Sequence, residues 1–134
     1  MKRRNGDAVQ LAGAHILVVE DEFLLLMELE SVLLRAGAEK VYLCRNVKEA
    51  LACAESRTLT LAILDVRLGP ESVVPVARRL TNHATPFMFY TGHIVTDSIF
   101  AEWPACKIVS KPARPQSIVQ ALTRLSSNSE AALC

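Results

Sequence analysis

Short apolar runs alternate along the chain with longer segments in which apolar residues recur every three or four positions. The runs are short and rich in β-branched or aromatic residues, which favours strands over helices. Five strands are predicted, over residues 16–19, 41–45, 61–65, 86–92 and 106–109. Most are apolar at successive positions, which indicates strands that are covered on both faces.

The segments between these runs have helical spacing. The first predicted helix, over residues 23–36, has one apolar face: Leu25, Leu29, Val32, Leu33 and Ala36. Gly37 is suited to end this helix as a C-cap. Further helices are predicted after Asn46, after Ser72 and from Pro115, whereas the segment 94–103 predicts only a short helix because Pro104 follows it.

A regular succession of strand and helix predicts a parallel sheet with helices on both faces, which is a doubly wound α/β fold. The length of 134 residues suits one domain. We place this domain at residues 14–127, between a flexible N-terminal leader at 1–13 and a frayed C-terminal tail at 128–134.

Composition excludes several classes of protein. The chain is 51% hydrophobic and 22% charged, so it can form a core, and its net charge of +1 gives no sign of a nucleic-acid or membrane partner. No apolar run has the length of a membrane span. Its cysteines are scattered without metal-ligand spacing, which predicts reduced thiols and a cytoplasmic protein: Cys44, Cys53, Cys106 and Cys134.

Polar residues stand where the predicted strands end. Glu20 and Asp21 end the first strand, Asp65 the third and Thr91 the fourth, and Lys111 follows the fifth. One acid after a strand usually solvates a loop or caps a helix. In a parallel sheet, however, all these residues meet at one edge, which is where ligands bind.

The residue types suggest a phosphoryl site. Neighbouring carboxylates repel unless a cation compensates them, and Mg²⁺ prefers carboxylate oxygens together with phosphate oxygens. Lys111 and the Thr91 hydroxyl are suitable donors to a phosphoryl group. One carboxylate must then be the nucleophile. Asp65 is the best candidate because it ends a central strand and Gly69 keeps the following loop open.

The same residues resemble the receiver domain of bacterial two-component response regulators. The resemblance covers roughly residues 14–127 and is carried by four motifs in order: VVEDE, LAILDVRLG, FYTG and SKP. Each motif alone is weak, but their order and spacing are specific. The resemblance implies a flavodoxin-like sheet with the strand order 2-1-3-4-5.

It also implies roles for single residues. Glu20 or Asp21, Asp65 and the backbone carbonyl of Arg67 would hold Mg²⁺. A sensor histidine kinase or a histidine phosphotransfer protein would phosphorylate Asp65, and Thr91 and Lys111 would bind the phosphoryl oxygens. Lys111-Pro112 would be a cis peptide. A protein of this kind is a phosphoacceptor rather than an enzyme, and it acts on a downstream protein or within a phosphorelay.

The chain departs from the family in three respects. Ile108 stands where the switch usually has an aromatic residue, and the fourth helix is short, although many receivers form homodimers through that region. No output domain follows the last predicted helix. Arg67 and His93 flank the expected path of the hydrolytic water, and we hypothesise that they set the lifetime of the aspartyl phosphate; solvated loop side chains are the alternative.

Other functions are less well supported. A degenerate receiver that binds partners without phosphate is the main alternative, and Ile108 favours it. A phosphatase or phosphotransferase of the aspartyl-phosphate type usually has a second acid where this chain has Arg67, which cannot act as a general acid. Nucleotide binding would need glycines where the first loop has acids.

Overall fold

The structure, a computed structural model, describes residues 10–92 and 98–127. Its central sheet has five parallel strands in the order β2-β1-β3-β6-β7. The strands are β1 (His15–Val19), β2 (Lys40–Cys44), β3 (Leu61–Leu64), β6 (Phe87–Thr91) and β7 (Ile108–Ser110). Counted along the chain, this is the expected order 2-1-3-4-5, so the predicted fold class is confirmed.

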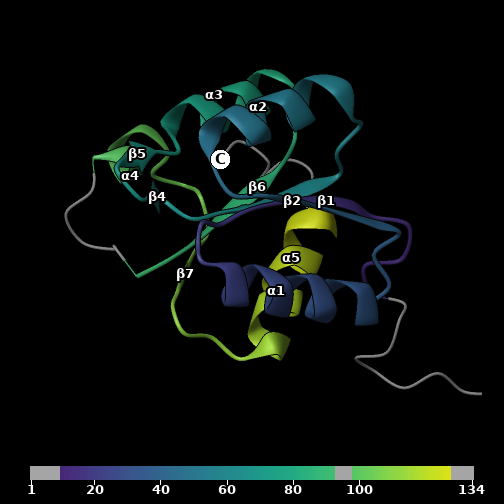
Figure 1. Cartoon of the computed structure of the whole chain (residues 1–134). Coiled ribbons are helices and arrows are strands. Elements are labelled where there is room, and N and C mark those ends of the chain that lie inside the picture. The colour runs from purple at the N-terminus through teal and green to yellow at the C-terminus, as the bar shows by residue number, and fades with distance from the viewer. Residues whose placement is uncertain (1–9, 93–97, 128–134) are drawn as a thin grey trace, which may run out of the picture.

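Helices cover both faces of the sheet, as Figure 1 shows. They are α1 (Phe23–Arg35), α2 (Val47–Ser56), α3 (Val74–Asn82), α4 (Ile99–Glu102) and α5 (Pro115–Ser127). One face packs against α1 and α5, and the opposite face packs against α2 and α3. Because both faces are covered, β3 and β6 are buried at every position.

The helix limits follow from local sequence. Asn46 begins α2, and its Oδ1 accepts a hydrogen bond from the Glu49 N–H at 2.9 Å. Glu49 in turn accepts one from the Arg45 N–H at 2.8 Å, one residue before the cap, so the contact is a variant of the capping box. Gly37, with a φ of 106°, follows the end of α1 in the left-handed region that glycine adopts without strain.

Two predicted details are wrong. The last strand covers Ile108–Ser110 instead of 106–109. The buried face of α1 consists of Leu26, Leu29 and Leu33, so its centre is rotated from the predicted one, and Leu25 and Val32 are only partly buried. Most residues of α1 are apolar, so helical spacing is compatible with more than one buried face. The sequence alone therefore predicts the orientation of this helix only approximately.

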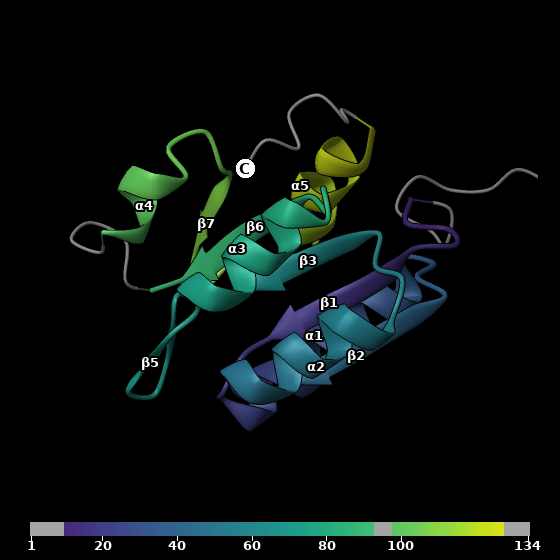
Figure 2. The same ribbon diagram turned by 90° about the horizontal axis from the view of Figure 1, so that it is seen from above.

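A small hairpin follows β3 and was not predicted. Its strands, β4 (Arg67–Leu68) and β5 (Glu71–Ser72), pair antiparallel and project from the sheet edge in Figure 2. Gly69 makes the turn with a φ of 65°, which L side chains rarely adopt. The Glu71 carboxylate accepts a hydrogen bond from the Val47 N–H at 3.2 Å and so connects the hairpin to α2.

The segment before β1 is not a flexible leader throughout. Residues 10–13 form a turn, and Leu11 is buried in the α1/α5 side of the core. The Leu11 N–H donates to the Ala36 carbonyl at 2.9 Å, and the Leu11 carbonyl accepts from the Ala14 N–H at 3.0 Å. The predicted leader is therefore wrong for residues 10–13, while 1–9 and the tail at 128–134 lie outside the described residues.

The fourth helix is short, as expected. It has four residues and is followed by Trp103, which is buried and donates from Nε1 to the Thr81 hydroxyl at 3.0 Å. Arg78 and Glu102 form a two-point ion pair on the outside, at 3.0 and 3.1 Å. These contacts attach α4 to α3.

None of the helices in the described ranges has both the length and the apolar character that a membrane span requires. Cys44 and Cys53 are free thiols, and burial raises the pKa of Cys44 to about 12. Cys106 is disulfide-bonded, so the prediction of reduced thiols is wrong for this residue. Cys134 lies beyond the described part of the chain.

Candidate functional site

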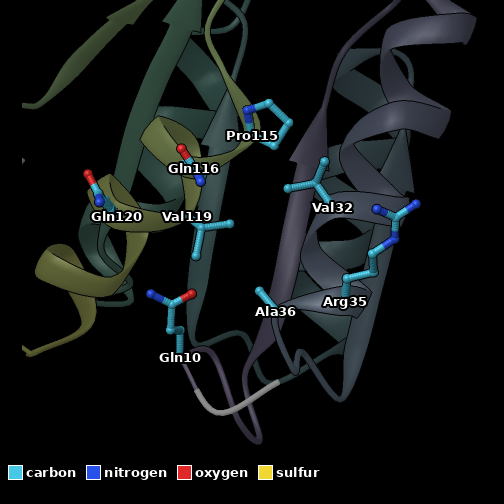
Figure 3. Close-up of a pocket in the computed structure, with 8 residues that line it drawn as sticks. All are labelled: Gln10, Val32, Arg35, Ala36, Pro115, Gln116, Val119 and Gln120. Carbon is cyan, nitrogen blue, oxygen red and sulfur yellow. The ribbon is translucent and has the colours of Figure 1, made fainter. Parts of the chain in front are cut away.

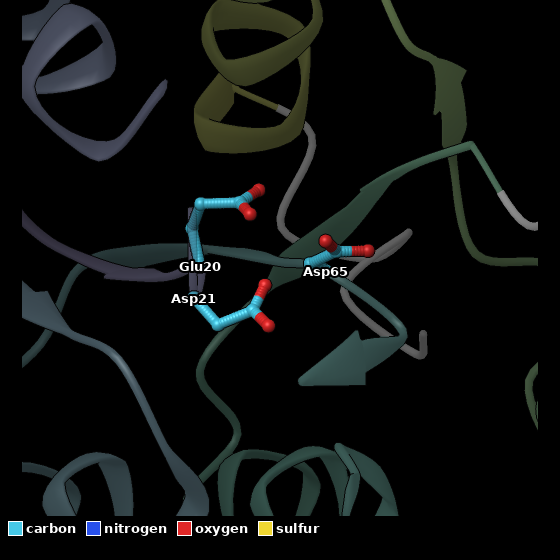
Figure 4. A group of neighbouring side chains, drawn as sticks. All are labelled: Glu20, Asp21 and Asp65. Atoms are coloured by element: carbon cyan, nitrogen blue, oxygen red, sulfur yellow. The ribbon is translucent and has the colours of Figure 1, made fainter. Parts of the chain in front are cut away.

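Three carboxylates meet at the carboxyl edge of the sheet, as predicted. Glu20 and Asp21 follow β1, and Asp65 follows the neighbouring β3 (Figure 4). One oxygen from each of the three lies within 4.8 Å of the others. The Asp65 N–H donates to the Val19 carbonyl at 3.0 Å, which continues the sheet ladder and fixes the acid beside β1.

Two of these acids are buried. Glu20 is 2% exposed and Asp65 is 5% exposed, whereas Asp21 is half-buried. Buried carboxylates are costly unless they are paired, so the surroundings must supply compensation. The Glu20 carboxylate accepts a hydrogen bond from the Glu22 N–H at 3.1 Å, which provides a small part of this compensation.

Lys111 supplies the larger part. Its Nζ lies 2.8 Å from Oε1 of Glu20 and 2.8 Å from Oδ2 of Asp65, so one ammonium joins both acids. Lys111 comes directly after β7, and its N–H donates to the Thr91 carbonyl at 3.0 Å. The Lys111-Pro112 peptide is cis, as the resemblance implied.

The pKa values of Glu20 and Lys111 reflect the close packing of charged groups at this site. Burial raises the pKa of Glu20 from 4.5 to about 7, and the charge of Asp65 adds to the rise, while the hydrogen bond from Lys111 opposes it. Burial by itself would lower the pKa of Lys111, but its hydrogen bonds to Asp65 and Glu20 outweigh that effect and raise it. One ammonium therefore pairs with two of the three acids, and the pKa of Glu20 stays raised despite this contact.

The donor set fits a hard divalent cation. The Oδ1 atom of Asp65 is buried and has no hydrogen-bond partner among the described residues. It faces a cluster of carboxylate oxygens, which are the ligands that Mg²⁺ prefers. A buried carboxylate oxygen without a hydrogen-bond partner needs an explanation, and coordination of a metal ion would provide one.

Two of the remaining predicted residues, Thr91 and Arg67, belong to elements next to this cluster. Thr91 is fully buried at the end of β6, the strand next to β3. Arg67 begins β4, with its side chain exposed, and the neighbouring turn at Gly69 lies near Asp21: a Cβ on Gly69 would be 3.8 Å from Oδ2 of that acid. His93 lies outside the described residues.

Sequence reasoning did not assign a role to Tyr90. The residue precedes Thr91 in β6, and its hydroxyl accepts a hydrogen bond from the Ala113 N–H at 3.1 Å. The Lys111 ammonium lies 5.9 Å from the centre of its ring. The only sign in the sequence was a large hydroxyl-bearing aromatic residue directly before the threonine.

Two grooves lie along α1. One, of about 780 Å³, extends from the site between α1 and the segment after β7, and it is lined by Leu24, Leu25 and Met27 together with Tyr90 and Lys111. Leu24, which lines this groove, and the preceding Phe23 are both exposed.

The other groove, of about 470 Å³, lies between α1 and α5, where Val32, Ala36 and Val119 face one another (Figure 3). It contains none of the acids of the site.

The fold has close structural neighbours. A CheY-like response regulator receiver domain protein from Methanospirillum hungatei JF-1 superposes with a TM-score of 0.79 at 20% identity, covering 89% of this chain and 98% of that one. A response regulator receiver protein from Sinorhizobium medicae WSM419 gives 0.77 at 24% identity, covering 87% and 97%. These identities are low, so the likeness concerns the fold.

The response regulator PhyR from Brucella abortus is also similar, with a TM-score of 0.74 and 21% identity over 95% of this chain and 52% of that one. This chain therefore matches about half the length of PhyR.

No curated protein matches the sequence. The family model of the response regulator receiver domain matches residues 16–123, which is most of the chain and includes every acid of the cluster. The chain belongs to the response regulator receiver domain family.

Proposed function

We propose that this chain is a phosphoacceptor of a two-component system, in which Asp65 receives a phosphoryl group from a histidine kinase or a histidine phosphotransfer protein. One observation carries the proposal: an ammonium that bridges two buried acids, one of which keeps an unpaired oxygen. Such an arrangement is poor for stability alone, because two buried acids share one lysine and a third acid lies beside them. It suits a site whose charges are rearranged by a phosphoryl group.

The chemistry follows from the residues. A carboxylate oxygen of Asp65 forms a bond to phosphorus while the bond from phosphorus to the donor histidine nitrogen breaks, and the electron pair of that bond returns to the imidazole. Lys111 then pairs with a phosphoryl oxygen instead of a carboxylate. Thr91, at the end of the neighbouring strand, is the second donor in this proposal.

Mg²⁺ is the cofactor of the proposed reaction. Glu20, Asp21, Asp65 and the backbone carbonyl of Arg67 would hold it, and it would neutralise negative charge on the transferring phosphoryl group. The side chain of Arg67 is exposed beside this position. We keep the hypothesis that Arg67 and His93 affect how long the aspartyl phosphate lasts.

The groove beside the site supports a protein as the phosphodonor. Leu24, Leu25 and Met27 of α1 line this groove together with two acids, Glu22 and Glu28, and Lys111 lines it as well. Exposed apolar residues next to a reactive group are typical of a docking surface. A helix carrying the donor histidine would cover them and reach Asp65 from the open edge of the sheet.

The degenerate receiver remains the second candidate, because of one observation. Ile108 is partly buried against the α2/α3 side of the core and pairs with Phe89. It has no ring or hydroxyl that could change position after phosphorylation. With α4 reduced to four residues, the region that many receivers use for homodimers also differs.

Intact mass tests the proposal. The protein is incubated with Mg²⁺ and acetyl phosphate, or with a histidine kinase if the small donor fails, and wild type is compared with Asp65→Ala and the isosteric Asp65→Asn. A gain of one phosphoryl group by wild type alone is expected. No gain from either donor, in a folded protein that binds Mg²⁺, would favour the degenerate receiver.

A further inference from the structure

Tyr90 occupies a buried position between the sheet and the segment that carries Lys111. It is 3% exposed and lies on the α1/α5 side of β6, in the same core region as Met88. The neighbouring Thr91 holds the same segment by its backbone, through the Lys111 N–H at 3.0 Å. Two successive residues of β6 thus contact the chain after β7.

The Tyr90 hydroxyl holds the far end of that segment. It accepts a hydrogen bond from the Ala113 N–H at 3.1 Å. Pro112 has no N–H, so Ala113 provides the first backbone donor after Lys111. The hydroxyl and the Thr91 carbonyl therefore hold the segment on both sides of the cis peptide.

The Tyr90 ring acts on the ammonium itself. Nζ of Lys111 is 5.9 Å from the ring centre, a distance at which the face of an aromatic ring attracts a cation. The same ammonium is 2.8 Å from both Glu20 and Asp65. The ring gives it a favourable contact that does not depend on either carboxylate.

We propose that Tyr90 is a positioning residue for Lys111: its hydroxyl fixes the segment after β7, and its ring keeps the ammonium beside Asp65 when the charges at the site change. The proposal rests on the proposed function, because the purpose of a fixed lysine is to bind the phosphoryl group. A phenylalanine would fill the same space, so a tyrosine that only filled the core would not need its hydroxyl.

Two variants separate the two contacts. Tyr90→Phe removes the hydroxyl and keeps the ring, and it leaves the packing almost unchanged. Tyr90→Leu removes both. Tyr42→Phe is the matched control, because Tyr42 is the other tyrosine of the chain, is half-buried in β2 and has the Arg57 guanidinium 5.5 Å from its ring centre, away from the site.

The first readout needs neither metal nor phosphate. The nitrogen NMR signal of the Lys111 ammonium, assigned by its loss in Lys111→Met, and the exchange rate of the Ala113 amide are measured in the metal-free protein. Tyr90→Phe should speed exchange of the Ala113 amide by about fivefold, the ratio expected for loss of one neutral hydrogen bond. Tyr90→Leu should also shift the Lys111 signal.

The second readout is the initial rate of phosphorylation by acetyl phosphate with Mg²⁺. Tyr90→Phe should lower it by about fivefold if the segment must be fixed during transfer, and Tyr90→Leu should lower it further. Tyr42→Phe should leave both readouts at the wild-type values. Thermal unfolding of each variant shows whether it is folded.

Unchanged Ala113 exchange and an unchanged Lys111 signal in both Tyr90 variants would overturn the proposal, as would changes of the same size in Tyr42→Phe. If wild type is not phosphorylated, the proposed function fails, but the NMR comparison still decides whether Tyr90 positions Lys111. If wild type is phosphorylated and both Tyr90→Phe and Tyr90→Leu react at the same rate as wild type, the positioning role is refuted.

Discussion

Replacing Glu20 by glutamine should change how the stability of the metal-free protein depends on pH. Glu20 is 2% exposed, and burial raises its pKa from 4.5 to about 7. The folded state therefore holds a proton that the unfolded state releases between these two values. Glutamine keeps the shape of the side chain and cannot titrate.

The sign follows from proton binding. A carboxyl whose pKa is raised on folding contributes its full stability below about pH 4.5, and this contribution is lost as the pH rises through about 7. The whole difference corresponds to about 3 kcal/mol, of which about 2.5 kcal/mol falls between about pH 5 and about pH 8. Lys111, whose pKa is raised, stays charged throughout this interval.

The assay is urea unfolding of both proteins without metal at the two pH values. The free energy of unfolding of Glu20→Gln minus that of wild type should increase by about 2.5 kcal/mol from about pH 5 to about pH 8. Glu28→Gln, which changes an exposed acid of α1, is the control and should show no such trend. A difference between Glu20→Gln and wild type that is independent of pH would refute the reasoning.

Three further outcomes are expected. Mg²⁺ at ten times its dissociation constant should raise the free energy of unfolding by about 1.4 kcal/mol, measured by urea unfolding, and Asp65→Asn should reduce this gain. Phe89→Ala should lower the free energy of unfolding by about 3–5 kcal/mol in the same assay, because Phe89 is fully buried. Its ring packs edge-on against those of Phe87 and Phe100, with 5.5 and 5.6 Å between ring centres. A loss below about 1 kcal/mol would contradict this reasoning. Asn46→Ala should cost about 1 kcal/mol, because Asn46 caps α2, and a neutral result would show that water replaces the cap.

The sheet could be predicted from sequence because its strands are buried on both faces. The run from Ile16 to Val19 leaves no polar face, so it could form neither a surface strand nor an amphipathic helix. Details that depend on tertiary contacts were harder to predict from the sequence. The hairpin after Asp65 has strands of two residues, too short for any periodic pattern, and Leu11 lies in residues 9–14, a run that is also too short to show one.

The acids of the site were also predictable, because strand ends are fixed by the parallel sheet. Glu20, Asp21 and Asp65 meet as expected, and Lys111 contacts two of them. The contacts of Tyr90 could not be predicted, because they depend on the path of the chain after β7. A side chain that points across a strand to a later loop leaves no periodic pattern in the sequence.

The packing of Leu11 determines where this protein can be cut or joined to another one. The family model begins at residue 16, yet the turn at residues 10–13 places Leu11 against α1 and α5. A fragment that began at His15 would lose a buried leucine, a contribution of about 2 kcal/mol, and the hydrogen bond to Ala36. A module fused in front of the receiver should therefore be attached before Gln10.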